Sequence, residues 1–100
     1  FKLINLSWRV TMELVLRNMT EDIVLRKIDQ MKNGLDCCTC EHCRLDIASY
    51  ALNRLPAKYV ATTQGELLSR LDTLEPQFDA TVMTVILQGA MIVKLHPRHK

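Results

Sequence analysis

Residues 37–43 read Cys37-Cys38-Thr39-Cys40-Glu41-His42-Cys43 and bring all four cysteines of the chain together within seven positions. Adjacent cysteines reach disulfide geometry only with a distorted peptide, because the bond needs Cα atoms about 4.4–6.8 Å apart and a near-perpendicular torsion. Zinc, in contrast, takes thiolate or imidazole ligands in a tetrahedron, and short Cys-x-Cys and Cys-x-x-Cys loops supply them. The stretch therefore predicts a zinc-binding loop.

The Cys-x-Cys-x-x-Cys pattern indicates which thiols bind the metal. Cys40 and Cys43 form the firm pair, and Cys38 precedes them in the pattern. Three or four sulfur ligands lower the Lewis acidity of the ion, so a structural Zn²⁺ is predicted rather than a catalytic one. A tetrahedral site needs one more ligand, and we add Cys37 to the predicted set. Several other donors remain open for that position: His42, Asp36, a distant histidine, water or a partner chain.

Length and composition predict one compact domain. The chain has 100 residues, of which 48% are hydrophobic, with three glycines and three prolines. These values suit a helical domain with one modest core and exclude a disordered chain. The net charge of +2 is too small to favour direct nucleic-acid binding. We expect a single domain over residues 12–96, with a leader or vector-derived segment at residues 1–11 and a basic tail at residues 97–100.

The sequence also indicates where the protein resides. Residues 1–10 lack the continuous apolar stretch and the small-residue cleavage site of a secretory signal. The longest uncharged run, residues 80–93, is shorter than the ~20 apolar residues that span a membrane. Clustered thiols without a signal peptide are typical of the reducing cytoplasm. We therefore expect a cytoplasmic protein without a membrane span.

Hydrophobic periodicity predicts an all-α fold, a compact domain of four helices. The helices are expected over residues 12–33, 41–54, 63–74 and 76–95, with an extended connector at residues 59–62 that is at most an edge strand. Gly34 and Pro56 stop the first two helices. Thr63 and Glu66 have the spacing of a capping box, and Pro76 suits the first turn of the last helix. The buried stripe of the second helix is expected to contain Leu45, Ala48, Ala51, Leu52 and Leu55.

The last predicted helix is apolar on nearly all of its faces. Such a helix must be covered on every side, and a domain of this size rarely covers it alone. We therefore expect a homodimer that is built mainly on this helix. The residues expected at the two-fold axis are Val82, Val85, Ile86 and Val93.

Three segments of the chain resemble the late competence development protein ComFB family. They are Asn18-x-x-Glu21-x-x-Val24, the stretch Cys38-Thr39-Cys40-Glu41-His42-Cys43-Arg44-Leu45-Asp46-Ile47, and the stretch Ala51-Leu52-Asn53-Arg54-Leu55-Pro56-x-Lys58-Tyr59-Val60. The similarity extends over residues 12–96 and is most specific over residues 38–60. This chain departs from the family at Ala57, where a second proline is common, and at Cys37, which adds a thiol before the usual three.

The resemblance implies a small helical dimer with zinc in its cysteine loop. The sulfur-rich metal site and the absence of a His-x-Glu or His-Glu-x-x-His motif separately predict a protein that is not an enzyme. Founding members are encoded beside DNA-uptake genes, and cyanobacterial relatives are implicated as receptors for cyclic dinucleotides such as cyclic di-GMP. The implied function is a signalling or competence-accessory protein, with a protein partner also possible. The alternative is a thiol redox or zinc-handling protein, since residues 40–43 form a Cys-x-x-Cys motif.

A cyclic dinucleotide requires cations for its phosphates and flat groups on which its bases stack. Arg54 is the best single candidate, because a guanidinium pairs with phosphate and also stacks on guanine. The other residues with suitable chemistry are Asn53, Lys58, Tyr59, Arg44 and Arg70. Solvated surface charge and a tyrosine capping the core are the simpler interpretation of the same set.

Overall fold

The computed structural model describes residues 14–72 and 74–96, which form two strands, four α-helices and one short 3-10 helix. The mostly helical fold is confirmed, with a small sheet added to it. The predicted leader at residues 1–11 and the basic tail at residues 97–100 lie outside the described residues. In chain order the elements are β1 (Leu14–Asn18), α2 (Met19–Met31), η1 (Lys32–Gly34), α3 (Glu41–Leu52), β2 (Tyr59–Thr63), α4 (Gln64–Asp72) and α5 (Pro76–Leu95).

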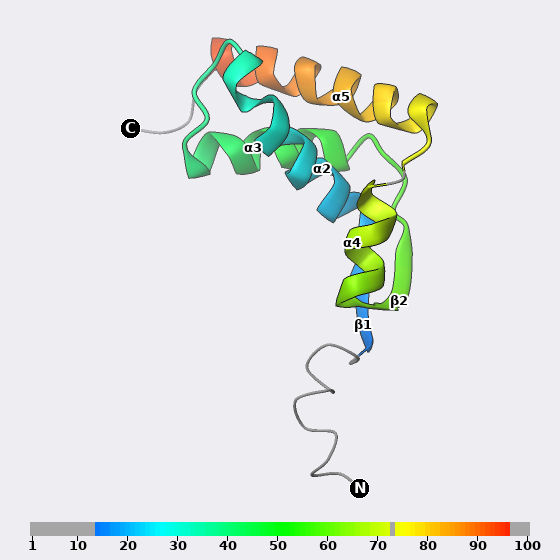
Figure 1. Cartoon of the computed structure of the whole chain (residues 1–100). Helices are drawn as coiled ribbons and strands as arrows, with labels where there is room; N and C mark the ends of the chain where they lie inside the picture. Colours follow the sequence, from blue (N-terminus) through cyan, green and yellow to red (C-terminus); the bar gives the residue numbers. More distant parts are fainter. Residues whose placement is uncertain (1–13, 73, 97–100) are drawn as a thin grey trace, which may run out of the picture.

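The elements are arranged as a helical body and an arm (Figure 1). The body consists of α2, α3 and α5, with α5 packed mainly against α3. The arm consists of the β1–β2 sheet with α4 beside β2. The loop that carries the cysteines joins η1 to α3 at the end of the body that lies away from the arm.

Residues 14–18 are a strand, so the prediction of one helix over residues 12–33 is wrong at its beginning. β1 pairs antiparallel with β2, with Leu16 opposite Ala61 and Asn18 opposite Tyr59. An apolar run as short as residues 14–16 is compatible with either a strand or a helix. Pairing with residues 59–63 makes the segment a strand, because the hydrogen bonds between the two strands satisfy backbone groups of both segments. The connector expected at residues 59–62 is accordingly a strand of this sheet.

Asn18 marks the point where β1 ends and α2 begins. Its side-chain oxygen accepts hydrogen bonds from the backbone N–H of Thr20, at 3.2 Å, and of Lys58, at 2.9 Å. The first of these bonds caps α2, and the second holds the turn before β2. Thr20 Oγ1 also donates to the carbonyl oxygen of Pro56 at 2.8 Å. The arm is therefore tied to the body by hydrogen bonds at this junction.

Replacing Asn18 by alanine tests this junction. Asn18→Ala removes the helix cap and the bond to Lys58 together, so we expect unfolding free energy to fall by about 1–2 kcal/mol. Urea unfolding followed by circular dichroism measures the loss. Asn33→Ala, at an exposed position of η1, is the matched control. Equal losses in the two variants would show that Asn18 does not link the arm to the body.

The start of α4 follows the sequence prediction. Glu66 Oε1 accepts a hydrogen bond from the backbone N–H of Thr63 at 3.1 Å, and the backbone N–H of Glu66 donates to Thr63 Oγ1 at 3.2 Å. This reciprocal pair is the predicted capping box. Pro76 lies in the first turn of α5, also as predicted. Local chemistry therefore sets the beginnings of both helices.

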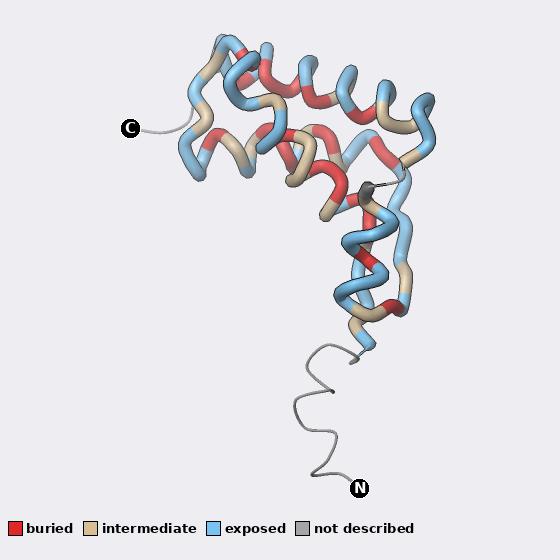
Figure 2. Tube along the Cα trace, in the orientation of Figure 1, coloured by how far each residue is buried: buried red, intermediate tan, exposed pale blue. Residues whose placement is uncertain are grey.

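Buried apolar residues gather where α2, α3 and α5 face one another (Figure 2). Leu45 is 48% exposed, so its predicted place in the buried stripe of the second helix is wrong. The buried face of α3 differs from the predicted one because apolar residues occupy several faces of the helix. Packing against α5 determines which of them are buried. The side chains that α3 buries are Cys43, Ile47, Ala48 and Ala51.

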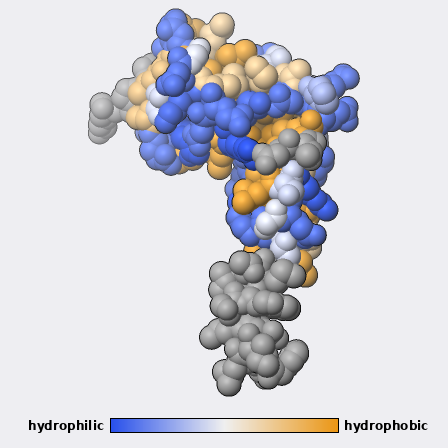
Figure 3. Space-filling model, viewed as in Figure 1, coloured by the Kyte–Doolittle hydropathy of each residue, from blue (hydrophilic) through white to orange (hydrophobic). Residues whose placement is uncertain are grey.

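α5 has an inner and an outer apolar face. Val82, Ile86 and Val93 are buried in the body of a single chain, and Val85 is partly buried against the same core. The expected placement of Val82, Ile86 and Val93 across a two-fold axis is therefore wrong, whereas for the partly buried Val85 it stays a prediction. We call the exposed residues at every fourth position the outer stripe of α5; they are Met83, Leu87, Met91 and Leu95. Hydrophobic residues reach the surface along α5 and on the arm in Figure 3.

Among the described residues, α5 is the helix that is long and apolar enough to cross a membrane, judged by length and composition alone. Residues 80–93 are only its uncharged centre, and the whole helix has 20 residues. In this structure 33% of its most apolar window is buried inside the protein. The core helix of a soluble protein and a signal sequence satisfy the same two criteria.

Candidate metal centre and ligand pockets

Three cysteines of the loop converge on one point. The Sγ atoms of Cys38, Cys40 and Cys43 all lie within 4.8 Å of one another, and we call these residues the cysteine triad. Cys40 occupies the N-cap position of α3, and Cys43 lies in the first turn of that helix. Cys38 and Cys40 are exposed, whereas Cys43 is fully buried. The triad thus has a buried base and a solvent-facing rim.

Ion pairs hold the loop in place on both sides. Arg44 forms a two-pronged pair with Asp29, with Nε–Oδ1 at 2.8 Å and Nη2–Oδ2 at 2.9 Å, and so links α3 to α2. Lys94 Nζ approaches Asp36 Oδ2 at 2.5 Å, which links the loop to the end of α5. Leu35 fills the core beneath the loop. The rest of the fold therefore positions the triad.

The thiols of the loop differ in their acidity. Burial raises the pKa of the Cys43 thiol to about 12. A hydrogen bond from the backbone of Cys43, followed by one from the side chain of Cys38, lowers the pKa of Cys40. Burial also raises the pKa of Cys37. A metal ion at the triad must displace a firmly held proton from Cys43, because a thiolate is the ligand.

The candidates for a fourth ligand lie apart from the triad. Cys37 is partly buried and packs against the hydrophobic core. His42 Nε2 faces Asp46 Oδ2 at 3.7 Å along α3, and Asp36 pairs with Lys94. In the part of the chain that the structure describes, no imidazole, carboxylate or fourth thiol joins the cluster. The donors present fit zinc in chemical type, and they supply three of its four positions.

Lys58 and Arg70 are two predicted ligand residues that the fold brings to one pocket. This pocket, which we call the basic pocket, has a volume of about 520 Å³ and lies where the arm meets the first turns of α5. Lys58 Nζ lies 5.4 Å from the centre of the Phe78 ring, which also lines the pocket. Phe78 was missed as a site residue, because nothing in the sequence connects it to Lys58.

Asn53 and Arg54 line a different pocket, of about 270 Å³, between α3 and α5. The Arg54 guanidinium carbon lies 3.6 Å from the centre of the Tyr50 ring, and Nη1 donates to the carbonyl oxygen of Tyr50 at 3.1 Å. The structure places Arg44 elsewhere again, in its ion pair with Asp29, and leaves Tyr59 68% exposed on the arm. The predicted ligand set is therefore divided among separate surfaces.

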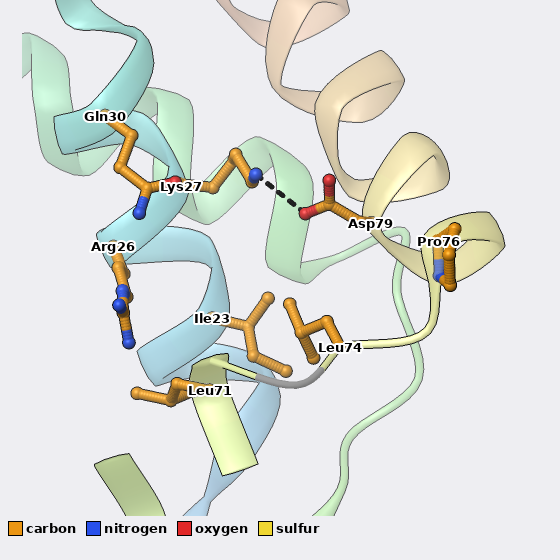
Figure 4. A pocket seen from close by; sticks show the side chains of 8 residues that line it. All are labelled: Ile23, Arg26, Lys27, Gln30, Leu71, Leu74, Pro76 and Asp79. Atoms are coloured by element: carbon orange, nitrogen blue, oxygen red, sulfur yellow. Dashed lines mark ion pairs between the residues drawn. The ribbon is translucent and has the colours of Figure 1, made fainter. Parts of the chain in front are cut away.

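A third pocket, of about 360 Å³, lies between α2, α4 and the start of α5 (Figure 4). Lys27 Nζ reaches Asp79 Oδ1 at 2.7 Å across it and so joins α2 to α5. Ile23 and Leu74 form its apolar floor in the same view. Its lining contains none of the ligand residues predicted from the sequence.

Comparison with known proteins identifies the class of this helical, cysteine-loop fold. The family described as "Late competence development protein ComFB" matches residues 17–97, and the chain belongs to this family. A solved structure described as "Structural characterization of the late competence protein ComFB from Bacillus subtilis" matches with a TM-score of 0.72 and 23% sequence identity. The match covers 84% of this chain and 96% of that one. No curated protein matches the chain. ComFB is a competence protein family and not a known class of enzymes.

Proposed function

We propose that this chain is a non-enzymatic signalling or accessory protein, a homodimer that a structural zinc ion stabilises and that binds a cyclic dinucleotide. The observation that carries the proposal is the convergence of three thiols at the start of α3. Membership of the ComFB family agrees with an accessory role in competence. Elemental analysis of the purified protein tests for zinc. Calorimetric titration with cyclic di-GMP and cyclic di-AMP tests for the cyclic dinucleotide.

Zinc at the triad would hold together parts of the chain that the fold already brings near. Cys38 would bind from the loop, Cys40 from the N-cap position of α3, and Cys43 from the first turn of that helix. The bound ion would supply binding free energy that exists only in the folded state, as it does in small zinc domains.

The basic pocket offers the groups that a cyclic dinucleotide requires. Lys58 and Arg70 bring positive charge for phosphate, and Phe78 brings an aromatic ring for a base. A volume of about 520 Å³ is in the range of small-molecule sites. The N-terminus of α5, whose dipole favours an anion, adjoins the pocket together with the carboxylate of Glu75, so Lys58 and Arg70 leave the lining with a net charge of +1. These features favour this pocket over the one that contains Arg54.

Charge removal at the basic pocket should weaken nucleotide binding selectively. Lys58→Ala and Arg70→Ala should each lower the affinity for cyclic di-GMP by about 10–100-fold, the effect of one charge-assisted hydrogen bond. Arg54→Ala removes a charge that stacks on Tyr50 in another pocket, so it should leave the affinity unchanged. Isothermal titration calorimetry on the three variants measures these differences.

The opposite result, with Arg54 required and Lys58 and Arg70 dispensable, would move the site to the pocket between α3 and α5. Absence of binding by the unmodified chain at high micromolar nucleotide would remove the ligand from the proposal. An accessory role in competence, without a nucleotide, would then remain.

The homodimer is proposed from the outer stripe of α5. Leu87 is 48% exposed, Met91 65% and Leu95 66%, and two apolar pockets lie along these residues. A continuous apolar strip of this length on a small protein favours a protein partner. A second copy is the simplest partner, since a two-fold axis would place one stripe against the other.

A further inference from the structure

The number of donors at the cysteine triad limits which ions it can bind fully. Three Sγ atoms lie within 4.8 Å of one another, and the described residues contribute no other donor to the cluster. Zinc is four-coordinate in structural sites, so three thiolates leave one of its positions to an outside donor. Trivalent arsenic, in contrast, is complete with three thiolates, because its lone pair occupies the remaining direction. The triad as it stands is therefore a complete donor set for a three-coordinate, thiol-seeking ion.

We infer that the cysteine triad binds trivalent arsenic, in the form of arsenous acid, through Cys38, Cys40 and Cys43. Soft thiolate donors select soft ions of this type. Three As–O bonds break and three As–S bonds form, each thiol proton leaves with a hydroxyl group as water, and no atom changes its oxidation state. Arsenous acid brings its own hydroxyl groups to accept these protons. The inference uses the same loop as the proposed zinc site, but it does not depend on zinc being bound.

The rim and base of the triad suit an ion that approaches from solvent. Cys38 and Cys40 are exposed and can react first, and Cys43 closes the pyramid from its buried position. Arg44 anchors the first turn of α3 to Asp29 and so fixes the helix start at which Cys40 and Cys43 lie. A preorganised donor set binds more tightly than a flexible one, since less conformational entropy is lost.

Cys37 provides an internal reference, because it directly precedes Cys38 but packs against the core. The structure therefore predicts which thiol stays free when arsenic is bound. In the folded chain with arsenic bound, Cys37 should be the cysteine that still reacts slowly with an alkylating reagent. In the unfolded chain all four cysteines lie on one flexible segment, so the free thiol should be distributed among them.

Titration of the metal-free, folded chain with sodium arsenite tests the inference. A phosphine reductant replaces thiol reductants, which would compete for arsenic. One equivalent should protect three of the four thiols, and peptide mapping after alkylation should find Cys37 as the free one. Cys38→Ser should raise the dissociation constant by more than about 100-fold, since loss of even an outer partner of a metal site costs about 10–100-fold. Cys37→Ser should leave it unchanged.

Protection of only two thiols, or equal effects of Cys37→Ser and Cys38→Ser, would overturn the inference. So would an affinity that does not fall when the chain is unfolded in guanidinium chloride. Zinc analysis separates this inference from the proposed function. Zinc held by four sulfur atoms including Cys37, seen by X-ray absorption, would refute the three-thiol site and preserve a structural zinc. Arsenic bound by three thiols in a chain that retains no zinc would support the three-thiol site and refute the structural zinc.

Discussion

Cys40→Ser and Cys43→Ser should each abolish stoichiometric zinc binding and lower the melting temperature of the protein by the largest amount of any change considered. Structural zinc in small peptide sites contributes about 10–16 kcal/mol of apparent binding free energy near neutral pH. That free energy stabilises the native state only, because the unfolded chain lacks a formed site. Cys43→Ser should have the stronger effect, since it also places a hydroxyl group at a fully buried position.

Elemental analysis and calorimetric melting of the two variants measure this effect, and Cys37→Ser is the control. Cys37 packs against the core and lies outside the triad, so the control should retain its zinc. Equal zinc loss in Cys37→Ser and Cys40→Ser would identify Cys37 as the fourth ligand, as the sequence allowed. If both triad variants melted at the same temperature as the unmodified chain, the metal would have no structural role.

Leu87→Glu should convert the protein from a dimer to a folded monomer. Leu87 lies at the centre of the outer stripe, where it is 48% exposed in the single chain. A charge there would be buried without a partner in a two-fold interface, which costs several kcal/mol. It would meet only water in the monomer, so the fold itself should persist. Sedimentation velocity measures the mass, and far-ultraviolet circular dichroism measures the helix content.

Two variants of α5 separate dimer loss from general damage. Thr81→Glu adds the same charge at an exposed position away from the outer stripe and should leave the dimer intact. Ile86→Ala acts on the inner face, where the side chain is fully buried, and should lower stability by about 2–5 kcal/mol. An unmodified chain that sediments as a monomer at micromolar concentration would refute the dimer, and an unchanged dimer in Leu87→Glu would move its interface elsewhere.

Local signals predicted the features that depend on local chemistry. Spacing alone brought Cys38, Cys40 and Cys43 into one loop at a helix start, and the structure places their sulfur atoms together. The reciprocal bonds of Thr63 and Glu66 follow from a four-residue pattern. Each of these features is decided within a few residues of the chain, so no knowledge of the fold is needed to predict it.

Features that depend on residues far apart in the chain cannot be predicted from sequence patterns. The apolar pattern of residues 14–18 fits a helix as well as a strand, and the partner that makes it a strand, β2, lies more than 40 residues further along the chain. The sequence does not distinguish the inner face of α5 from an interface, because the helix is apolar nearly all round, and only packing against α3 shows that Ile86 is buried in one chain. Lys58 and Phe78 likewise meet only when the arm and α5 come together.

Native mass spectrometry of the protein purified without chelators tests most directly whether the cysteine triad holds a structural metal ion. We expect one zinc ion per chain, lost together with a fall in melting temperature when the protein is treated with a strong chelator. A chain that carries no zinc, with a melting temperature that the chelator leaves unchanged, would refute the structural metal site.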